Sequence, residues 1–230
     1  YNELMGYSSL SQCVRDLEAT GRIRRVDCEL DPRLEIAAVQ RRAYVKGGPA
    51  LLFTRPKGST LPMVGNLFGT LDRARYVLRH GLSAVETLVR LKADPADILK
   101  QPHLLLKALG AAPHLLPWRT GRPEVLARSC RISDLPQLVS WPRDGGPYIT
   151  LPLVYTEDAR QPGWRRSNLG MYRVQLSGGS YEMDKEVGLH YQIHRGIGVH
   201  HHAALQAGKP LKVSIHVGGP PALSLAAGCA

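Results

Sequence analysis

The sequence predicts an α+β protein in which an α/β unit comes first and a β-rich unit follows. Three observations lead to this prediction. Helical and strand patterns alternate over the first half, prolines and glycines then gather in one short stretch, and strand patterns dominate the remainder. The predicted boundaries are an N-terminal α/β domain at residues 7–112, a Pro-rich linker at 113–123 and a β-rich domain at 124–230.

The first half begins with two helices. Ser9 is a side-chain acceptor suited to cap a helix whose apolar positions follow the 3.6-residue period until Gly21. Asp31, followed by Pro32, predicts the start of a second helix, which Gly47 ends. Short apolar runs predict strands at 23–26, 50–53 and 63–66, and helical patterns follow at 71–79, 83–92 and 95–109.

The second half is dominated by strand patterns. These fall at 148–155, 169–176, 187–194 and 211–217, with one helical stretch at 197–207. Pro152 marks an edge or a bulge, because proline cannot donate a hydrogen bond to the ladder. Gly218 and Gly219 form a turn before a short helix at 222–227. A strand, a glycine turn and a helix N-terminus form a general anion site, since free backbone amides and the helix dipole both favour negative charge.

Composition excludes several classes of protein. With 43% hydrophobic and 21% charged residues, the chain has the composition of an ordinary folded protein. No run approaches the roughly 20 uncharged apolar residues of a membrane span, and the first residues do not form a secretory signal. The four cysteines include no C-x-x-C pair. We therefore expect a cytoplasmic protein with reduced thiols and no transmembrane segment.

The formal net charge of +11 raises the question of a nucleic-acid partner. The surplus is spread evenly over the two halves, and only 6% of the residues are aromatic, which leaves little for base stacking. We therefore expect no nucleic-acid partner. An arginine-rich surface, or one that meets anionic small molecules, explains the charge better.

The densest polar run is Ser167–Arg173. On the predicted strand, Asn168, Gly170 and Tyr172 share one face, and the alternate residues share the other. Asn168 offers a neutral oxygen to a hard cation, and Gly170 allows close approach of a ligand or a backbone. Arg173 carries a fork suited to a carboxylate or a phosphate. The alternative is that Arg173 lies on a strand face and only forms an ion pair with an acidic side chain.

Histidines form a second cluster, with five of the nine between residues 190 and 202. His190 and His194 lie on one face of the predicted strand, as metal ligands would, and neutral imidazole suits manganese, iron or zinc. For His200–His202 we prefer a solvated helix start to ligation. H-E-x-x-H, dinucleotide-binding, P-loop and G-x-S-x-G motifs do not occur.

Three ordered motifs resemble one family. S-N-L-G-M-Y-R at 167–173, H-Y-Q-I-H-R-G at 190–196 and V-G-G-P-P-A at 217–222 look like the UbiD family of reversible decarboxylases, which use prenylated FMN. The first half is similar too, from Y-S-S-L at 7–10 through G-P-A-L-L-F at 48–53 and V-G-N-L-F-G at 64–69. The resemblance implies an α/β N-terminal domain followed by a β-rich, split-barrel-like flavin-binding domain.

The resemblance also implies roles for individual residues. Asn168 and His194 would ligate a divalent metal, manganese, which anchors the flavin phosphate, and potassium is a further ion that the family allows. Arg173 would be the catalytic residue that holds the substrate carboxylate. The residues expected to line the cofactor are Asn168, Leu169, Gly170, Met171, Tyr172, Arg173, Gln192, His194 and Arg195.

The implied activity is reversible decarboxylation of an aromatic or α,β-unsaturated acid, for example of the 4-hydroxybenzoate type, with ubiquinone biosynthesis as a setting. A flavin prenyltransferase would supply the cofactor, and the protein would form a homo-oligomer. Members of the family are much longer and continue with a third metal ligand and two catalytic glutamates, which Glu182 and Glu186 do not match. We therefore expect a fragment, a frameshifted sequence or a chain completed by a partner. The alternative function is a non-catalytic flavin-binding or oligomerisation module.

Overall fold

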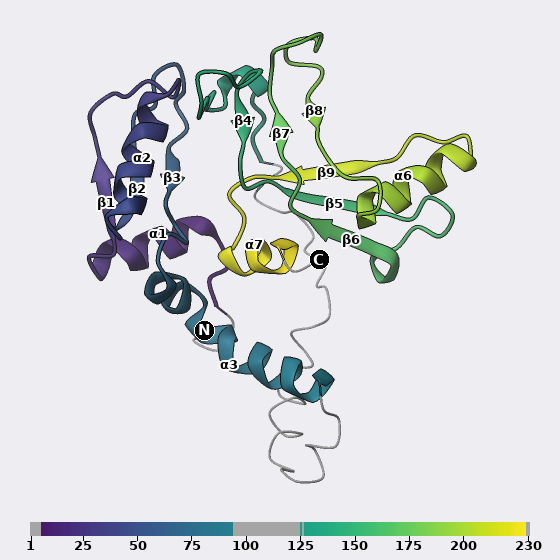
Figure 1. Ribbon diagram of the computed structural model, residues 1–230, viewed down its shortest axis with the longest axis horizontal. Coiled ribbons are helices and arrows are strands. Elements are labelled where there is room, and N and C mark those ends of the chain that lie inside the picture. Colours follow the sequence, from purple (N-terminus) through teal and green to yellow (C-terminus); the bar gives the residue numbers. More distant parts are fainter. Residues whose placement is uncertain (1–5, 94–124, 126, 229–230) are drawn as a thin grey trace.

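The computed structural model describes residues 6–93, 125 and 127–228, which form helices and small three-stranded sheets (Figure 1). The helices are α1 (Leu10–Ala19), α2 (Glu35–Val45), α3 (Leu71–Ala93), α6 (Gly196–Gln206) and α7 (Pro221–Gly228), with 3-10 turns η3 (Ile132–Asp134) and η4 (Trp164–Arg166). The strands are β1 (Ile23–Val26), β2 (Ala50–Phe53), β3 (Met63–Gly65), β4 (Tyr148–Ile149), β5 (Leu153–Glu157), β6 (Ser167–Gly170), β7 (Val174–Gln175), β8 (Gly188–Leu189) and β9 (Val213–His216). The predicted α+β class is confirmed.

The N-terminal sheet has the order β1-β2-β3, with β1 parallel and β3 antiparallel to β2. All four residues of β2 are buried, because successive side chains enter two different clusters. Leu52 packs with Cys13 and Leu17 of α1, whereas Phe53 packs with Ile36 of α2. A continuous apolar strand is therefore what this position requires.

The two predicted N-terminal caps have different outcomes. Ser9 caps α1 as expected, since its hydroxyl accepts a hydrogen bond from the Gln12 N–H at 3.2 Å. Asp31 does not cap α2, which begins only at Glu35. The Asp31 carboxylate instead accepts a hydrogen bond from the Arg33 N–H at 2.7 Å and closes its own turn.

α3 is one helix where the sequence predicts two, at 71–79 and 83–92. Gly81 lies inside it, and glycine in a helix interior costs only about 1 kcal/mol relative to alanine, so it does not end the helix. The helix predicted at 95–109 and the linker predicted at 113–123 lie outside the described residues.

The segment V-G-N-L-F-G at 64–69 is held by a buried cation. Arg73 is only 5% exposed, and its guanidinium donates hydrogen bonds to the carbonyl oxygens of Leu67, Gly48 and Asn66 at 3.0, 2.8 and 2.6 Å. Asn66 has a φ of 55° and donates a hydrogen bond from Nδ2 to the Pro49 carbonyl at 2.9 Å. These contacts give this motif a structural role.

The second half contains two sheets, with the orders β4-β7-β8 and β6-β5-β9. Two predicted strands are each divided between them. The run 148–155 becomes β4 and β5, with the buried Pro152 in the break, and the run 169–176 becomes β6 and β7. The chain therefore crosses from one sheet to the other at both divisions, and it crosses a third time between β8 and β9. Residues on either side of a crossing do not share a strand face.

The remaining strands are shorter than predicted. The run 187–194 contains only β8, at Gly188–Leu189, and the run 211–217 contains β9, at Val213–His216. β9 is an edge strand, and Val213 is 38% exposed. α6 and α7 both contact β5 and β6, and α7 also contacts α3 (Figure 1). None of the described helices combines the length and the apolar character that crossing a bilayer requires.

Burial of Cys13 leads to a first prediction. Desolvation raises the pKa of its thiol to about 11, whereas Cys28 and Cys130 are exposed. In the native protein at pH 8, a maleimide should label Cys28 and Cys130 quickly and Cys13 only after unfolding, because the thiolate is the reactive form. Peptide mapping by mass spectrometry reads each site separately. Labelling of native Cys13 at the rate of Cys28 would contradict this packing.

Candidate cofactor and carboxylate site

β5 positions the site because it is the central strand of its sheet. Thr156 on β5 pairs with Asn168 on β6, so both side chains project from the same face. α6 covers this face, and His200 Nδ1 lies 2.9 Å from Thr156 Oγ1. Thr156 is 1% and His200 9% exposed, so a buried hydrogen bond fixes α6 over the sheet.

His200 thus differs from the solvated helix start that the sequence predicts. Only His202 of the three adjacent histidines is fully exposed, since His201 is half-buried and bonds Tyr191. The expectation is wrong for His200 because a polar partner, Thr156, lies on a strand that is distant in sequence. Neither Thr156 nor His200 belongs to the predicted site, and no local motif indicates their pairing.

Asn168 sits at the point where β6 meets the start of α6. Its Oδ1 atom occupies the space that a Cβ on Gly196 would fill, so the first residue of α6 has to be glycine for this contact. Its Nδ2 atom donates a hydrogen bond to the Tyr172 hydroxyl at 3.3 Å. Among the described residues, no donor is hydrogen-bonded to Oδ1, which packs against Gly196.

Met171–Arg173 form the second crossing between the sheets, so the predicted alternation of faces stops at Gly170. The Tyr172 ring folds back over Gly170, where a side chain would overlap it. Tyr172 thus lies beyond the end of β6, and its side chain turns back so that the hydroxyl reaches Asn168. Leu169 and Met171 are half-buried.

Arg173 lies just before β7, and its guanidinium contacts the neighbouring strand β4. Its Cζ atom is 4.2 Å from the centroid of the Tyr148 ring, a cation–π contact. Tyr148 is fixed in turn, because its hydroxyl donates a hydrogen bond to Gln175 Oε1 at 3.0 Å. Within the described part of the chain, no carboxylate lies at ion-pair distance from Arg173. The alternative of a surface ion pair therefore does not hold among these residues.

The turn between β8 and α6 carries the remaining predicted residues. Gln192, His194 and Arg195 are all exposed on it, and the Arg195 N–H donates a hydrogen bond to the Gln192 carbonyl at 3.0 Å. The prediction that His190 and His194 share a strand face is wrong, because β8 ends at Leu189. His190 packs against Tyr148 instead, with ring centroids 5.9 Å apart.

The structure therefore arranges the predicted residues in two groups. Asn168 lies beside Gly196 and is hydrogen-bonded to Tyr172, whereas Arg173 lies on Tyr148 in the other sheet. Gly196 follows His194 by two positions in the sequence. An amide oxygen and an imidazole suit a divalent cation. In the described ranges, His, Cys, Asp and Glu form no group of three that could hold a metal. Asn168 and His194 alone would supply only part of a coordination shell.

Asp158 follows β5 and is bound by Arg160. Its Oδ2 lies 2.8 Å from Arg160 Nη2, and its Oδ1 accepts hydrogen bonds from Arg160 Nε at 3.0 Å and from the Arg160 N–H at 2.9 Å. The side-chain hydrogen bonds from Arg160 hold the pKa of Asp158 well below its usual range. This carboxylate therefore stays ionised and does not supply a proton.

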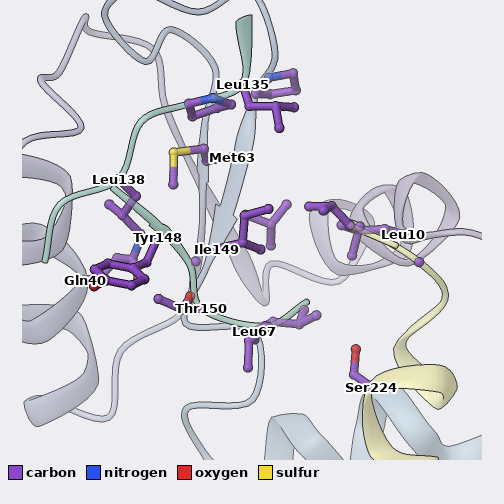
Figure 2. Close-up of a pocket in the computed structure, with 18 of the residues that line it drawn as sticks. Leu10, Gln40, Met63, Leu67, Leu135, Leu138, Tyr148, Ile149, Thr150 and Ser224 are labelled. Carbon is purple, nitrogen blue, oxygen red and sulfur yellow. The ribbon is translucent and has the colours of Figure 1, made fainter. Parts of the chain in front are cut away.

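An apolar cavity of about 260 Å³ lies between the N-terminal sheet and the second half of the chain (Figure 2). Leu10 of α1, Met63 of β3, Tyr148 and Ile149 of β4 and Ser224 of α7 are part of its lining. None of the residues predicted to bind the cofactor lines it. Tyr148 lies in its wall and also contacts Arg173, which links the cavity to the predicted site. Sequence reasoning did not identify Tyr148, although it precedes β5 in a recognisable strand pattern.

The contact between Asn168 and Gly196 makes a testable prediction about packing. Gly196→Ala should lower the free energy of unfolding by about 1–3 kcal/mol, the usual cost of overpacking, because the new methyl group overlaps Oδ1. Gly81→Ala is the control: it faces open space in α3 and should stabilise the protein by about 0.5–1 kcal/mol. Urea unfolding measures both variants.

The double variant Gly196→Ala with Asn168→Ala should recover part of this loss, because the overlapping amide is removed. Equal stability of the wild type and Gly196→Ala would show that Asn168 does not occupy this space.

Two family models match the chain. The model described as the 3-octaprenyl-4-hydroxybenzoate carboxy-lyase N-terminal domain matches residues 14–92. The model described as the 3-octaprenyl-4-hydroxybenzoate carboxy-lyase Rift-related domain matches residues 119–230. Together they cover most of the sequence.

Individual relatives are longer than this chain. An uncharacterized protein of Chlamydia trachomatis is 37% identical over 228 residues, which are 95% of this chain and 37% of the relative. A subunit of 4-hydroxybenzoate decarboxylase from Chlamydia pneumoniae is 37% identical over 205 residues, 86% of this chain and 33% of the relative.

A solved structure has the same fold. The UbiD-class enzyme HmfF of Pelotomaculum thermopropionicum, in an evolved dimeric form with prFMN, aligns with a TM-score of 0.70 and 26% identity over 96% of this chain and 47% of that one. The chain thus spans less than half the length of each of these proteins. Because both halves of the sequence match models of one family in the same order, the chain belongs to the UbiD family of carboxy-lyases.

Proposed function

We propose that this chain carries the cofactor-binding and carboxylate-binding part of a decarboxylase that uses prenylated FMN. Its substrate would be an aromatic or α,β-unsaturated carboxylic acid, for example of the 4-hydroxybenzoate type. The observation that carries the proposal is Arg173, an exposed guanidinium held on the ring of Tyr148. Tyr148 in turn lines the apolar cavity.

Arg173 suits a substrate carboxylate for two reasons. Its planar fork can donate two parallel hydrogen bonds to the two oxygens of a carboxylate, and stacking on Tyr148 restricts the side chain before the substrate arrives. Most of the lining of the neighbouring cavity is apolar, so it favours the unsaturated or aromatic part of an acid. Arg173 would thus bind and orient the acid by its charged end.

Asn168 and His194 are the residues that would hold the metal, which we propose to be manganese, with potassium as a second ion. The Oδ1 of Asn168 accepts no hydrogen bond from a described residue and lies at the start of α6, just after His194, which supports this assignment. Leu169, Gly170, Met171, Tyr172, Gln192 and Arg195 complete the proposed cofactor surface. When bound, prenylated FMN supplies the electron sink that lets carbon dioxide leave without a free carbanion.

The names of the relatives support these assignments. The HmfF structure contains prFMN and is dimeric, and the Chlamydia pneumoniae relative belongs to a 4-hydroxybenzoate decarboxylase. For this chain we accordingly propose prenylated FMN from a flavin prenyltransferase, a homo-oligomer, a cytoplasmic location and a division into domains at residues 7–112 and 124–230.

A non-catalytic module that binds flavin or oligomerises is the second candidate function. One observation favours it: among the described residues, no carboxylate lies at ion-pair distance from Arg173, where a proton donor would be needed.

Co-expression with a flavin prenyltransferase distinguishes the two functions. The purified chain should show flavin absorbance, and an enzyme should also release carbon dioxide from cinnamate-type or hydroxybenzoate-type acids. Flavin without carbon dioxide release would leave the module as the function. Absence of flavin would overturn both the enzyme and the flavin-binding module.

Arg173→Ala tests the role of the guanidinium. The variant should retain flavin, because Arg173 contacts the substrate and not the phosphate. It should bind cinnamate about 10- to 100-fold more weakly, the change expected for loss of hydrogen bonds to a charged group. Calorimetric titration of the flavin-loaded chain measures this affinity.

Arg165→Ala is the matched control, since Arg165 is also an exposed arginine stacked on an aromatic ring, that of Trp164. It should change neither flavin content nor affinity. Loss of flavin from the Arg173 variant would instead place this residue on the cofactor.

A further inference from the structure

Three aromatic side chains connect the strand that carries Asn168 with the turn that carries His194. The rings of Tyr172 and Tyr191 meet edge to face, with centroids 6.5 Å apart, and those of Tyr191 and His201 meet likewise at 6.0 Å. The Tyr191 hydroxyl is hydrogen-bonded to His201 Nδ1. We call Tyr172, Tyr191 and His201 the aromatic bridge.

At one end of the bridge, Tyr172 determines how the Asn168 amide is turned. An amide has a donor end and an acceptor end, and the hydroxyl of Tyr172 takes the donor end at 3.3 Å. The acceptor end is thereby directed towards Gly196 at the start of α6. The ring of Tyr172 is itself held, since it packs over Gly170 on one side and against Tyr191 on another.

At the other end, Tyr191 and His201 close the turn around His194. Residues 192–195 are all exposed, so packing against the core does not fix their position. Tyr191 precedes His194 and is half-buried, and His201 follows it on α6, which the buried bond between His200 and Thr156 fixes to the sheet. The hydrogen bond between Tyr191 and His201 therefore ties the exposed turn to a rigid helix.

We propose that the aromatic bridge is a set of positioning residues that holds His194 and Asn168 in place for a divalent metal. The inference rests on the proposed function, because it takes these two side chains as ligands. The bridge contacts both ligand-bearing segments through one continuous set of rings. Residues that orient ligands in this way typically change metal affinity by about 10- to 100-fold when removed.

The first measurement does not depend on a metal. Tyr191→Phe keeps the ring and removes the hydroxyl, so hydrogen–deuterium exchange of the amides between residues 190 and 199 should become about fivefold faster, as for loss of one ordinary hydrogen bond. His201→Leu should have the same effect. His201→Asn, which keeps a polar atom close to the position of Nδ1, should restore slow exchange. Tyr44→Phe is the control, because Tyr44 is 63% exposed on α2.

The second measurement is manganese affinity, read from the electron paramagnetic resonance signal of free Mn²⁺. Tyr191→Phe and Tyr172→Phe should each weaken binding about tenfold, whereas Tyr44→Phe should not change it. Faster exchange with unchanged manganese affinity would overturn the positioning role and leave the bridge a structural contact. Unchanged exchange in Tyr191→Phe would show that the hydrogen bond between Tyr191 and His201 does not hold the turn against α6.

Failure of the proposed function would look different. If the wild-type chain bound no Mn²⁺ at all, the metal assignment of Asn168 and His194 would be wrong. The positioning role of the aromatic bridge would then be wrong as well. The exchange data would still report whether Tyr191 and His201 close the turn.

Discussion

The antiparallel register of β5 with β6 and β9 is the constraint on which the rest of the second half depends. It pairs Thr156 with Asn168 on one side and with Val213 on the other, so that one face of the sheet receives α6. A slip by one residue would move every side chain of β5 to the opposite face and would separate Thr156 from His200. The position of α6, and with it the turn that carries His194, follows from this pairing.

The crossing between β6 and β7 has a complementary effect. Because the chain leaves one sheet after Gly170 and enters the other at Val174, Asn168 and Arg173 are close in sequence but belong to different surroundings. Asn168 faces the start of a helix, whereas Arg173 faces an aromatic ring beside an apolar cavity. Under the proposed assignment, one short motif would serve a metal and a carboxylate at the same time.

Much of this architecture could be predicted from the sequence, and the failures have a common cause. Ser9 and β2 were predictable because a cap and a buried apolar run are local signals. The family was predictable because its motifs occur in order. The division of the runs 148–155 and 169–176, and the burial of His200, depend on partners distant in sequence, which local periodicity does not report. For the same reason, the residues of the candidate site were identifiable by type, whereas Tyr148 and the bridge required the fold.

The edge strands β1 and β9 differ in a way that matters for handling the protein. β1 presents the exposed, charged Arg24 and Arg25 at its edge, and such charges discourage pairing with another chain. β9 contains no Lys, Arg, Asp or Glu that would discourage pairing in this way, because its residues are Val213, Ser214, Ile215 and His216. Its backbone is a template for strand addition, so at high protein concentration self-association should begin at β9 rather than at β1. Val213→Lys would be the natural way to protect it.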